Sequence, residues 1–257
     1  MFDLVVAVNN EDTLAKNLLR SPLLSKPGVS LQLQKGYRSA SVAYNAALSH
    51  CENDLVIFAH QDVYIPAEWE NAVVRNISCL DAMDPDWAVL GVYGVMSSGA
   101  QIGYVWSSGL NKVFGSRFDL PVPVESLDEL LIIVKRSSGV FFDDQLPGYH
   151  LYGTDLVQTA RSRNRTAYAI CAPVVHNSLP SLYLRNDYFD AYKYVVRKWK
   201  ANLPIVTCVA PIVRSPISYL RFRLRNRVNE FRYRNVNRQE LDRRYDSLVI
   251  AKQLEFE

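Results

Sequence analysis

A histidine, a glutamine and an aspartate, His60-Gln61-Asp62, directly follow an apolar segment that begins at Leu55. Such a run of apolar and β-branched residues is typical of a buried strand in a parallel sheet. Open α/β sheets bind ligands at the carboxyl ends of their strands. Asp62 is therefore a candidate ligand for a metal ion or for a phosphate-bearing substrate.

A second candidate ligand, His176, stands at the end of a later apolar segment, residues 167–175. If both segments are parallel strands of one sheet, Asp62 and His176 meet at the same sheet edge. A carboxylate, an imidazole and phosphate oxygens suit Mn²⁺ or Mg²⁺, and such an ion stabilises a leaving diphosphate. The alternative interpretation is an ordinary hydrogen-bonded histidine and an aspartate that caps a turn or helix.

Strand and helix patterns alternate along the first 180 residues. Helical patterns begin near residues 10, 39, 66 and 154, and strands are predicted at 2–8, 29–34, 55–59, 88–95, 130–134 and 167–175. This order favours a mostly parallel sheet with helices on both faces. Residues 96–120 lack clear periodicity and suggest an irregular excursion with a hairpin around 104–107. We predict one α/β domain over residues 1–180.

The chain after residue 180 shows helical patterns only, which predicts a C-terminal helical extension over residues 181–257. One helix is expected over 187–200 and a basic helical region from about 218 to 245. A basic amphipathic helix can lie on an anionic membrane surface. The alternative is a solvated helix packed on the α/β domain. The arginines of this region are Arg214, Arg221, Arg223, Arg225, Arg227, Arg232, Arg234, Arg238, Arg243 and Arg244.

Composition limits the class of protein. The 257 residues are 49% hydrophobic and 21% charged, which predicts a packed core. A net charge of +3 does not indicate nucleic acid as a partner, and no recognition motif accompanies the basic region. The four cysteines have no paired spacing and suggest reduced thiols. With no signal peptide and no run of ~20 apolar residues, we expect a cytoplasmic protein.

The ordered motifs of residues 1–180 resemble those of bacterial glycosyltransferases of the family 2 type, in which a His-x-Asp triplet serves as the metal motif. The resemblance implies the GT-A (Rossmann-like) fold, a nucleotide-diphosphate sugar as donor, an inverting transfer and a divalent metal, Mn²⁺ or Mg²⁺. The matching segments are Val8-Asn9-Asn10-Glu11, Ser41 with Tyr44-Asn45, His60-Gln61-Asp62, Ser126-Leu127-Asp128, Gly148 to Tyr152 with Asp155-Leu156, and Val175-His176.

The same resemblance implies roles for individual residues. Asp62 takes the place of the last aspartate of the Asp-x-Asp motif and binds the metal, and His176 matches a late metal-binding histidine. His60 replaces the first aspartate and would contact ribose or a metal-bound water. Donor-binding roles are implied for Val8, Asn9, Glu11, Ser41, Asn45, His60 and Asp128.

The catalytic base is where the chain departs from the family pattern. Many relatives carry Glu-Asp-x-Asp before a helix, and here these positions are Tyr152-Gly153-Thr154-Asp155. Gly153 has no group that accepts a proton, so Asp155 is the first candidate for the general base and His150 the alternative. Asp143 and Asp144 are further candidates. A carboxylate in the first turn of a helix is also favoured by the helix dipole alone.

We therefore expect a metal-dependent inverting glycosyltransferase that moves a sugar to a hydroxyl acceptor, a cell-surface glycan or a glycolipid. Peripheral contact with the inner face of an anionic membrane through the basic C-terminal region belongs to this expectation. Two alternatives stay open. One is a degenerate GT-A domain that binds a nucleotide sugar without transfer, and the other is a scaffold that associates with membranes or polyanions.

Overall fold

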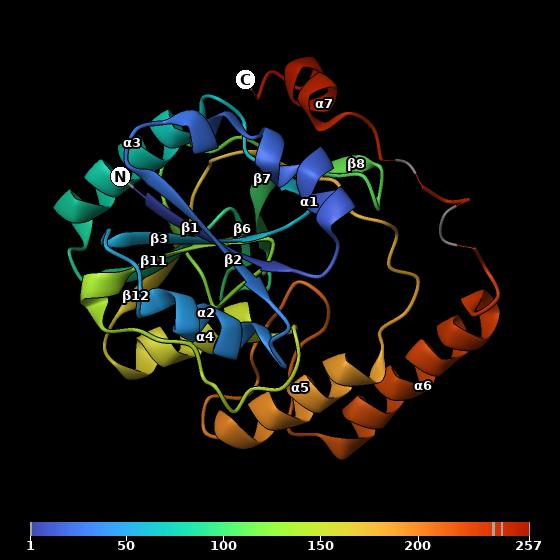
Figure 1. Ribbon diagram of the computed structural model, residues 1–257. Helices are drawn as coiled ribbons and strands as arrows, with labels where there is room; N and C mark the ends of the chain where they lie inside the picture. Colours follow the sequence, from blue (N-terminus) through green and yellow to red (C-terminus); the bar gives the residue numbers. More distant parts are fainter. Residues whose placement is uncertain (1, 238–239, 243, 257) are drawn as a thin grey trace.

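The computed structural model describes residues 2–237, 240–242 and 244–256. Its centre is a seven-stranded sheet with the strand order β2-β1-β3-β11-β5-β12-β9 (Figure 1). The bounds of these strands are β1 Phe2–Val8, β2 Val29–Lys35, β3 Leu55–His60, β5 Trp87–Gly91, β9 Val122–Pro123, β11 Leu131–Lys135 and β12 Thr166–Ala169.

Most strands of this sheet run in the same direction. β1 is parallel to β2 and β3, and β5 is parallel to β12. β11 lies between β3 and β5 and is antiparallel to both, so β3 and β5 share one direction. The predicted α/β class, a mostly parallel sheet flanked by helices with a helical C-terminal extension, is confirmed.

Helices cover both faces of the sheet because successive side chains of the buried strands point to opposite faces. In β1, Leu4 and Val6 belong to one core cluster and Val5 to the other. The first cluster is covered by α1 (Glu11–Lys16) and α3 (Trp69–Met83). The second is covered by α2 (Ala40–Leu48), α4 (Tyr152–Ser162) and α5 (Asn186–Lys198) (Figure 1).

Side-chain caps fix where the first two helices begin. The Asn10 side chain accepts a hydrogen bond from the Thr13 backbone N–H, and the Ser39 side chain accepts one from the Val42 N–H. Both helices start directly after strands β1 and β2. Their amino ends therefore lie at the sheet edge where the candidate ligands are found.

A second sheet has the strand order β10-β6-β7-β13-β4, with β8 paired to β7. The antiparallel pairing of β7 with β8 forms a hairpin whose turn follows Ser107, so residues 104–107, around which the hairpin was predicted, belong to its first strand. The strand bounds are β4 Val63–Tyr64, β6 Tyr93–Val95, β7 Gln101–Ser107, β8 Lys112–Gly115, β10 Ser126–Leu127 and β13 Val174–His176.

The single strand predicted over residues 167–175 is wrong. The chain forms β12 in the first sheet, turns through an Ala172 N–H to Ile170 carbonyl hydrogen bond of 3.0 Å, and forms β13 in the second sheet. Pro173 has no N–H to donate to a ladder, so the strand cannot continue through it. The strand predicted over 88–95 is likewise divided, into β5 and β6.

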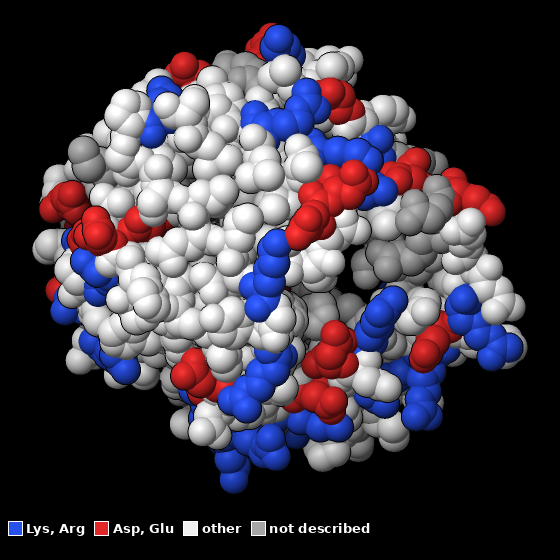
Figure 2. All heavy atoms as spheres, in the orientation of Figure 1, with Lys and Arg blue, Asp and Glu red and all other residues white. Residues whose placement is uncertain are grey.

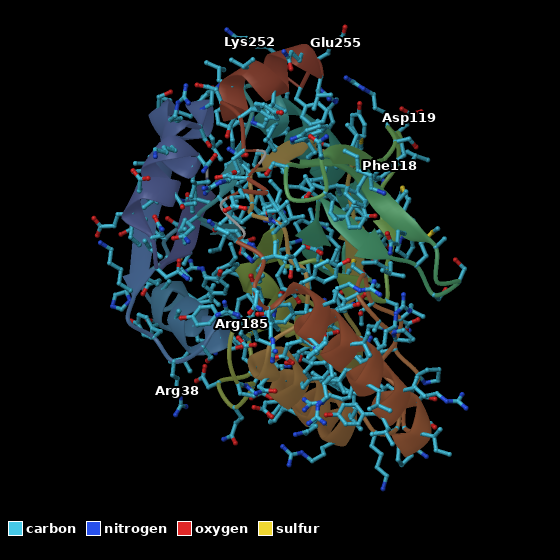
Figure 3. All side chains as sticks on the ribbon, turned by 90° about the vertical axis from the view of Figure 1, so that its right-hand side faces the viewer. Arg38, Phe118, Asp119, Arg185, Lys252 and Glu255 are labelled. Carbon is cyan, nitrogen blue, oxygen red and sulfur yellow. The ribbon has the colours of Figure 1, made fainter. Side chains whose placement is uncertain are left out.

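The C-terminal helices lie at two ends of the molecule. α5 and α6 (Pro216–Tyr233) lie side by side below the sheet in both ribbon views (Figures 1 and 3), and α7 (Ser247–Gln253) packs on Tyr64 and Val175 at the other end. α6 ends at Tyr233 and not near 245, because Asn235 and Asn237 favour turns. Arg238 and Arg243 lie outside the described residues.

Short 3₁₀ helices complete the described secondary structure: η1 Leu18–Arg20, η2 Pro22–Ser25 and η3 Arg136–Ser138. In the described part of the chain, no helix is both long enough and apolar enough to cross a membrane. The four cysteines are unpaired. The domain boundary near residue 180 stays a prediction. Beyond that boundary, α5 contributes Tyr188 and Tyr192 to the same core as α2 and α4.

Gly153 lies where α4 packs closely against β10. A Cβ there would lie 2.6 Å from the Leu127 carbonyl oxygen and 3.1 Å from Ile132 Cδ1. We expect Gly153→Ala to lower the free energy of unfolding by about 1–3 kcal/mol through overpacking, measured by chemical denaturation. Ser162→Ala, at the exposed end of the same helix, is the control. Equal stability of both variants would show that the helix shifts freely.

Candidate metal centre and its surroundings

The structure brings His60, Asp62 and His176 together at the end of β3. One ligand atom of each residue lies within 4.8 Å of the others, and His176 Nε2 is 3.4 Å from Asp62 Oδ1. The Asp62 and His176 side chains each keep 21% of their surface exposed. The three groups thus form a half-buried cluster with the nitrogen and oxygen donors that divalent metals bind.

The way in which Asp62 and His176 meet differs from the prediction. His176 ends β13, which is antiparallel to β4, and it stands opposite Val63 in that pairing. The Asn177 N–H also donates to the Asp62 backbone carbonyl at 2.8 Å. A short antiparallel pairing in the second sheet therefore joins the two ligands, and not two parallel strands at one edge of the first sheet.

Asp62 and His176 stabilise each other's charge. Burial raises the pKa of Asp62, but the neighbouring His176 and His60 outweigh it and hold that pKa at about 2. Burial lowers the pKa of His176, and Asp62 outweighs this effect, so the pKa of His176 is raised. A divalent cation at this position would replace the proton of His176, because a histidine ligand binds metal in its neutral form.

The protonation of His60 is fixed by Tyr152. The Tyr152 hydroxyl donates its one proton to the Glu129 carbonyl at 2.9 Å, so it accepts at 3.1 Å from His60 Nε2–H. Burial lowers the pKa of His60, which favours the neutral ring. His60 is therefore a neutral imidazole whose Nδ1 carries the lone pair, the form in which histidine serves as a ligand.

Gln61, to which the sequence assigned no role, holds the loop after β1 against the cluster. Its Oε1 accepts from the backbone N–H groups of Asn9 and Asn10 at 3.0 Å each, and its Nε2 donates to Asn9 Oδ1 at 2.5 Å. Val8 ends β1 at this loop. Glu11 is exposed and paired with Lys35 Nζ at 2.5 Å. Of the predicted donor-binding residues in this loop, Asn9 is the one that is hydrogen-bonded to the His60-Gln61-Asp62 triplet, and the donor-binding role of all three stays a prediction.

The other two predicted donor residues near the second helix differ in their contacts. The Ser41 hydroxyl is buried and, within the described residues, has no hydrogen-bond partner. Asn45 holds the loop after β11: its Nδ2 donates to the Phe142 carbonyl at 2.8 Å and to Asp144 Oδ1 at 2.6 Å. Asn45 therefore already has protein partners, and the donor-binding role of both residues stays a prediction.

The structure gives Asp155 strong partners inside the protein. Asp155 is 1% exposed, and its carboxylate accepts from Lys198 Nζ at 2.8 Å and from Trp199 Nε1 at 2.7 Å. Lys198 also pairs with Asp143 Oδ2 at 2.7 Å. These contacts join α4 and the loop at 143 to the end of α5. Asp155 as the base stays a prediction.

His150, the alternative base, lies closer to solvent. Its Nε2 is 3.7 Å from Asp187 Oδ2, and its ring meets that of Tyr188 edge-on at a centroid distance of 5.6 Å. Burial lowers the pKa of His150, although Asp187 opposes this effect. A neutral imidazole can accept a proton, so this role also stays a prediction.

Glu129 is a carboxylate that the sequence analysis missed. Its backbone carbonyl receives the Tyr152 hydrogen bond that orients His60, which places Glu129 next to the metal centre. Burial and the adjacent Asp128 raise the pKa of Glu129 to about 8, against hydrogen bonding from the Gly153 and Leu151 backbone. The signal in the sequence was the acid pair Asp128-Glu129 between two apolar segments.

A cavity of about 320 Å³ opens beside the cluster. His176 and Asp128 form polar parts of its wall, and the remaining lining comes from the second sheet and from the segments that follow β13 and residue 207. Apolar side chains form most of that lining, namely Tyr93, Val105, Leu110, Phe114, Leu130, Leu179 and Val209. The metal centre therefore has the Gln61-held loop and this cavity as neighbours.

The C-terminal segment is attached to the metal centre from behind. The Asn177 side chain donates to Asn17 Oδ1 at 2.8 Å and to Ser247 Oγ at 3.1 Å, and Ser247 donates to Asn17 Oδ1 at 2.6 Å. Arg244 pairs with Asp242 at 2.5 Å, and the negative charge of Asp62 also contributes to raising the pKa of Arg244. A guanidinium group thus stands near the metal ligands.

No protein-family model matches the chain. A protein of Fuscovulum blasticum described as "ATP synthase subunits region ORF 6" is 33% identical over 129 residues, which are 48% of this chain and 51% of that protein. The chain thus spans about half the length of this curated relative.

Solved structures with a similar chain arrangement include a mannosyltransferase, PcManGT from Pyrobaculum calidifontis, in complex with GDP-Man and Mn²⁺. Its TM-score is 0.46 at 11% identity, over 100% of this chain and 80% of that one. GalNAc-T7 with UDP, GalNAc and Mn²⁺ gives 0.47 at 13% identity, over 88% and 54%. S. aureus TarS with UDP-GlcNAc gives 0.44 at 15% identity, over 77% and 66%. With TM-scores below 0.5, these likenesses carry no argument about function.

Asp62→Asn tests the metal centre. We expect the affinity for Mn²⁺, measured by titration with electron paramagnetic resonance detection, to fall at least about 10-fold, since a neutral amide is a poor ligand for a divalent ion. Asp12→Asn, an exposed carboxylate on α1 paired with Lys16, is the control and should leave the affinity unchanged. Equal affinity of Asp62→Asn and the native protein would place the metal elsewhere.

Proposed function

We propose that the protein is a metal-dependent inverting glycosyltransferase of the GT-A, family 2 type. The observation that carries the proposal is the cluster of His60, Asp62 and His176 at the end of β3, with a ligand-sized cavity at its side. Oxygen and nitrogen donors beside a held loop suit a nucleotide diphosphate and its divalent ion. The donor is a nucleotide-diphosphate sugar and the metal Mn²⁺ or Mg²⁺.

In this proposal, Asp62 and His176 hold the metal, and the loop at Val8, Asn9 and Glu11 receives the nucleoside. Ser41, Asn45, His60 and Asp128 complete the proposed donor site. The metal, when bound, neutralises charge that develops on the leaving diphosphate.

The acceptor hydroxyl enters from the cavity and attacks the anomeric carbon opposite the leaving diphosphate. The bond from that carbon to the acceptor oxygen forms while the bond to the diphosphate oxygen breaks, and the proton of the hydroxyl passes to a carboxylate. We assign this role to Glu129, whose backbone carbonyl is joined to the cluster through Tyr152, because Asp155 is held by Lys198 and Trp199. A base with a pKa near the working pH is the most effective one.

The acceptor belongs to a glycan or to a lipid-linked sugar of a cell-surface polysaccharide. A cytoplasmic location with peripheral contact at the inner face of the membrane is part of this proposal. The mostly apolar lining of the cavity supports an acceptor that carries an apolar group beside its hydroxyl.

A second candidate function is binding of a nucleotide sugar without transfer. Gly153 stands where the family's base is found, and the nearby Asp155 is closed to solvent. This candidate predicts that nucleotide and metal bind while no acceptor is glycosylated. Turnover with any acceptor excludes it.

The direct test of the proposal is incubation of the purified protein with Mn²⁺ and a panel of UDP-, GDP- and dTDP-sugars. We expect one donor to be hydrolysed slowly in the absence of acceptor and faster with one, and chelation of the metal to abolish both reactions. Lack of nucleotide binding and of metal-dependent hydrolysis across the panel contradicts the proposal.

Glu129→Gln tests the base. We expect kcat to fall roughly 10²–10⁴-fold, because the amide cannot take the acceptor proton, while the affinity for nucleotide stays the same. In the native protein, kcat should rise with pH until Glu129 is ionised near its pKa of about 8. Glu52→Gln, an exposed carboxylate, is the control. A folded Asp155→Asn variant that loses turnover, beside an active Glu129→Gln variant, would assign the base to Asp155.

A further inference from the structure

The outer face of α6 is apolar and exposed over the whole length of the helix. Five large side chains there expose between 51% and 72% of their surface. At 3.6 residues per turn they fall within an arc of about 80° on the helix. The five are Ile217, Leu220, Leu224, Val228 and Phe231, and we call them the α6 stripe.

Arginines flank the α6 stripe on both sides. On the same helical wheel, Arg221, Arg225 and Arg232 lie along one border, and Arg223 and Arg227 lie beyond the other. Glu230 is the one acidic residue between Pro216 and Tyr233. Figure 2 shows Lys and Arg gathered along the lower edge of the molecule, over the region where Figure 1 draws α5 and α6.

The opposite face of α6 is fixed to the body of the protein, so the α6 stripe cannot turn inward. Tyr219 and Phe222 pack against Tyr192 of α5 at ring centroid distances of 5.3 and 6.1 Å. Asn226 receives the Leu184 N–H at 2.8 Å and donates to the Leu184 carbonyl at 2.9 Å. Leu184 belongs to the segment that leads from His176 to α5.

A groove beside α6 leads toward the metal centre. It has a volume of about 780 Å³, and Arg221 and Arg225 form part of its wall. Ser181 and Val209 line both this groove and the cavity that contains His176 and Asp128, so the two hollows adjoin. The groove beside α6, with Arg221 and Arg225 in its wall, thus adjoins the cavity that contains His176 and Asp128.

We propose that the α6 stripe and its flanking arginines seat the protein on the surface of an anionic membrane, so that the groove delivers a lipid-linked acceptor to the metal centre. Apolar side chains between two rows of cations match a bilayer interface, where the former enter the acyl boundary and the latter meet phosphate head groups. The seating stands on α6 alone, and the delivery of an acceptor rests on the proposed glycosyl transfer.

Co-sedimentation with vesicles tests the seating without any need for activity. We expect the protein to bind vesicles of phosphatidylcholine mixed with phosphatidylglycerol. Its binding to vesicles of phosphatidylcholine alone should be much weaker. Leu224→Glu should abolish binding, while Val74→Glu on α3 should retain it; Leu224 and Val74 have the same exposed fraction, 51%. Arg221→Ala combined with Arg225→Ala should weaken binding about fivefold for each charge removed. Circular dichroism and thermal unfolding establish that each variant is folded.

Three results would overturn the seating. One is equal vesicle binding by Leu224→Glu and native protein. Another is that the native protein binds a single-stranded RNA oligomer as tightly as it binds vesicles and that Leu224→Glu does not weaken the RNA binding. That result indicates a general polyanion-binding surface. The third is a dimer in solution that Leu224→Glu dissociates, with no vesicle binding, which indicates a contact between two copies of the chain.

Binding of UDP or GDP with Mn²⁺, measured on the same samples by calorimetry, separates the two proposals. Vesicle binding without nucleotide binding leaves the seating intact and contradicts the glycosyltransferase. Nucleotide binding without vesicle binding contradicts the seating on a membrane and leaves the glycosyltransferase proposal intact. Where both occur, labelled sugar from the donor should appear in the lipid fraction of vesicles made with bacterial lipid extract, and the Leu224→Glu variant should lose this transfer. Equal transfer by that variant contradicts delivery from the membrane.

Discussion

The antiparallel pairing of β4 with β13 is the contact on which the candidate site depends. It sets His176 opposite Val63 and so next to Asp62, although 113 positions separate the two ligands along the chain (176 − 62 − 1). The strands are short, and α7 packs on their outer side through Tyr64 and Val175. The last helix of the chain therefore supports the geometry of a site formed by the ends of β3 and β13.

The groups of this site are held before any ligand arrives. Tyr152 fixes the tautomer of His60, Gln61 holds the backbone of Asn9 and Asn10, and Asn177 connects Asp62 to the C-terminal segment. Such supporting hydrogen bonds orient ligands and set their basicity. When a divalent cation replaces the proton of His176, its two positive charges interact more strongly with the Asp62 carboxylate than that proton does. Tyr152, which contacts His60, also donates to the Glu129 carbonyl and so places the Glu129 backbone beside the cluster.

The sequence predicted the α/β class and the helices on both faces of the sheet, and it paired Asp62 with His176, because apolar periodicity and polar residues at strand ends are local signals. His60, for which the resemblance implied contact with ribose or a metal-bound water, lies in the same cluster. It did not predict the reversed direction of β11 or the division at Pro173, which arise from pairings between distant segments. Glu129 and Gln61 were missed because their roles come from contacts with Tyr152 and Asn9. Asp155 was favoured because it is the carboxylate nearest to Gly153 in the segment that resembles the family's Glu-Asp-x-Asp pattern. The contacts of its carboxylate with Lys198 and Trp199, more than 40 positions later, were not visible from that pattern.

The central claim is that Asp62 and His176 bind a metal that also contacts a nucleotide's diphosphate. Electron spin echo envelope modulation of Mn²⁺ bound to the protein with UDP or GDP tests it directly. The account predicts nitrogen couplings from histidine imidazole together with phosphorus couplings from the nucleotide, and loss of a nitrogen coupling in His176→Ala. A bound Mn²⁺ with phosphorus couplings but no imidazole nitrogen, or no binding of Mn²⁺ at all, would contradict it.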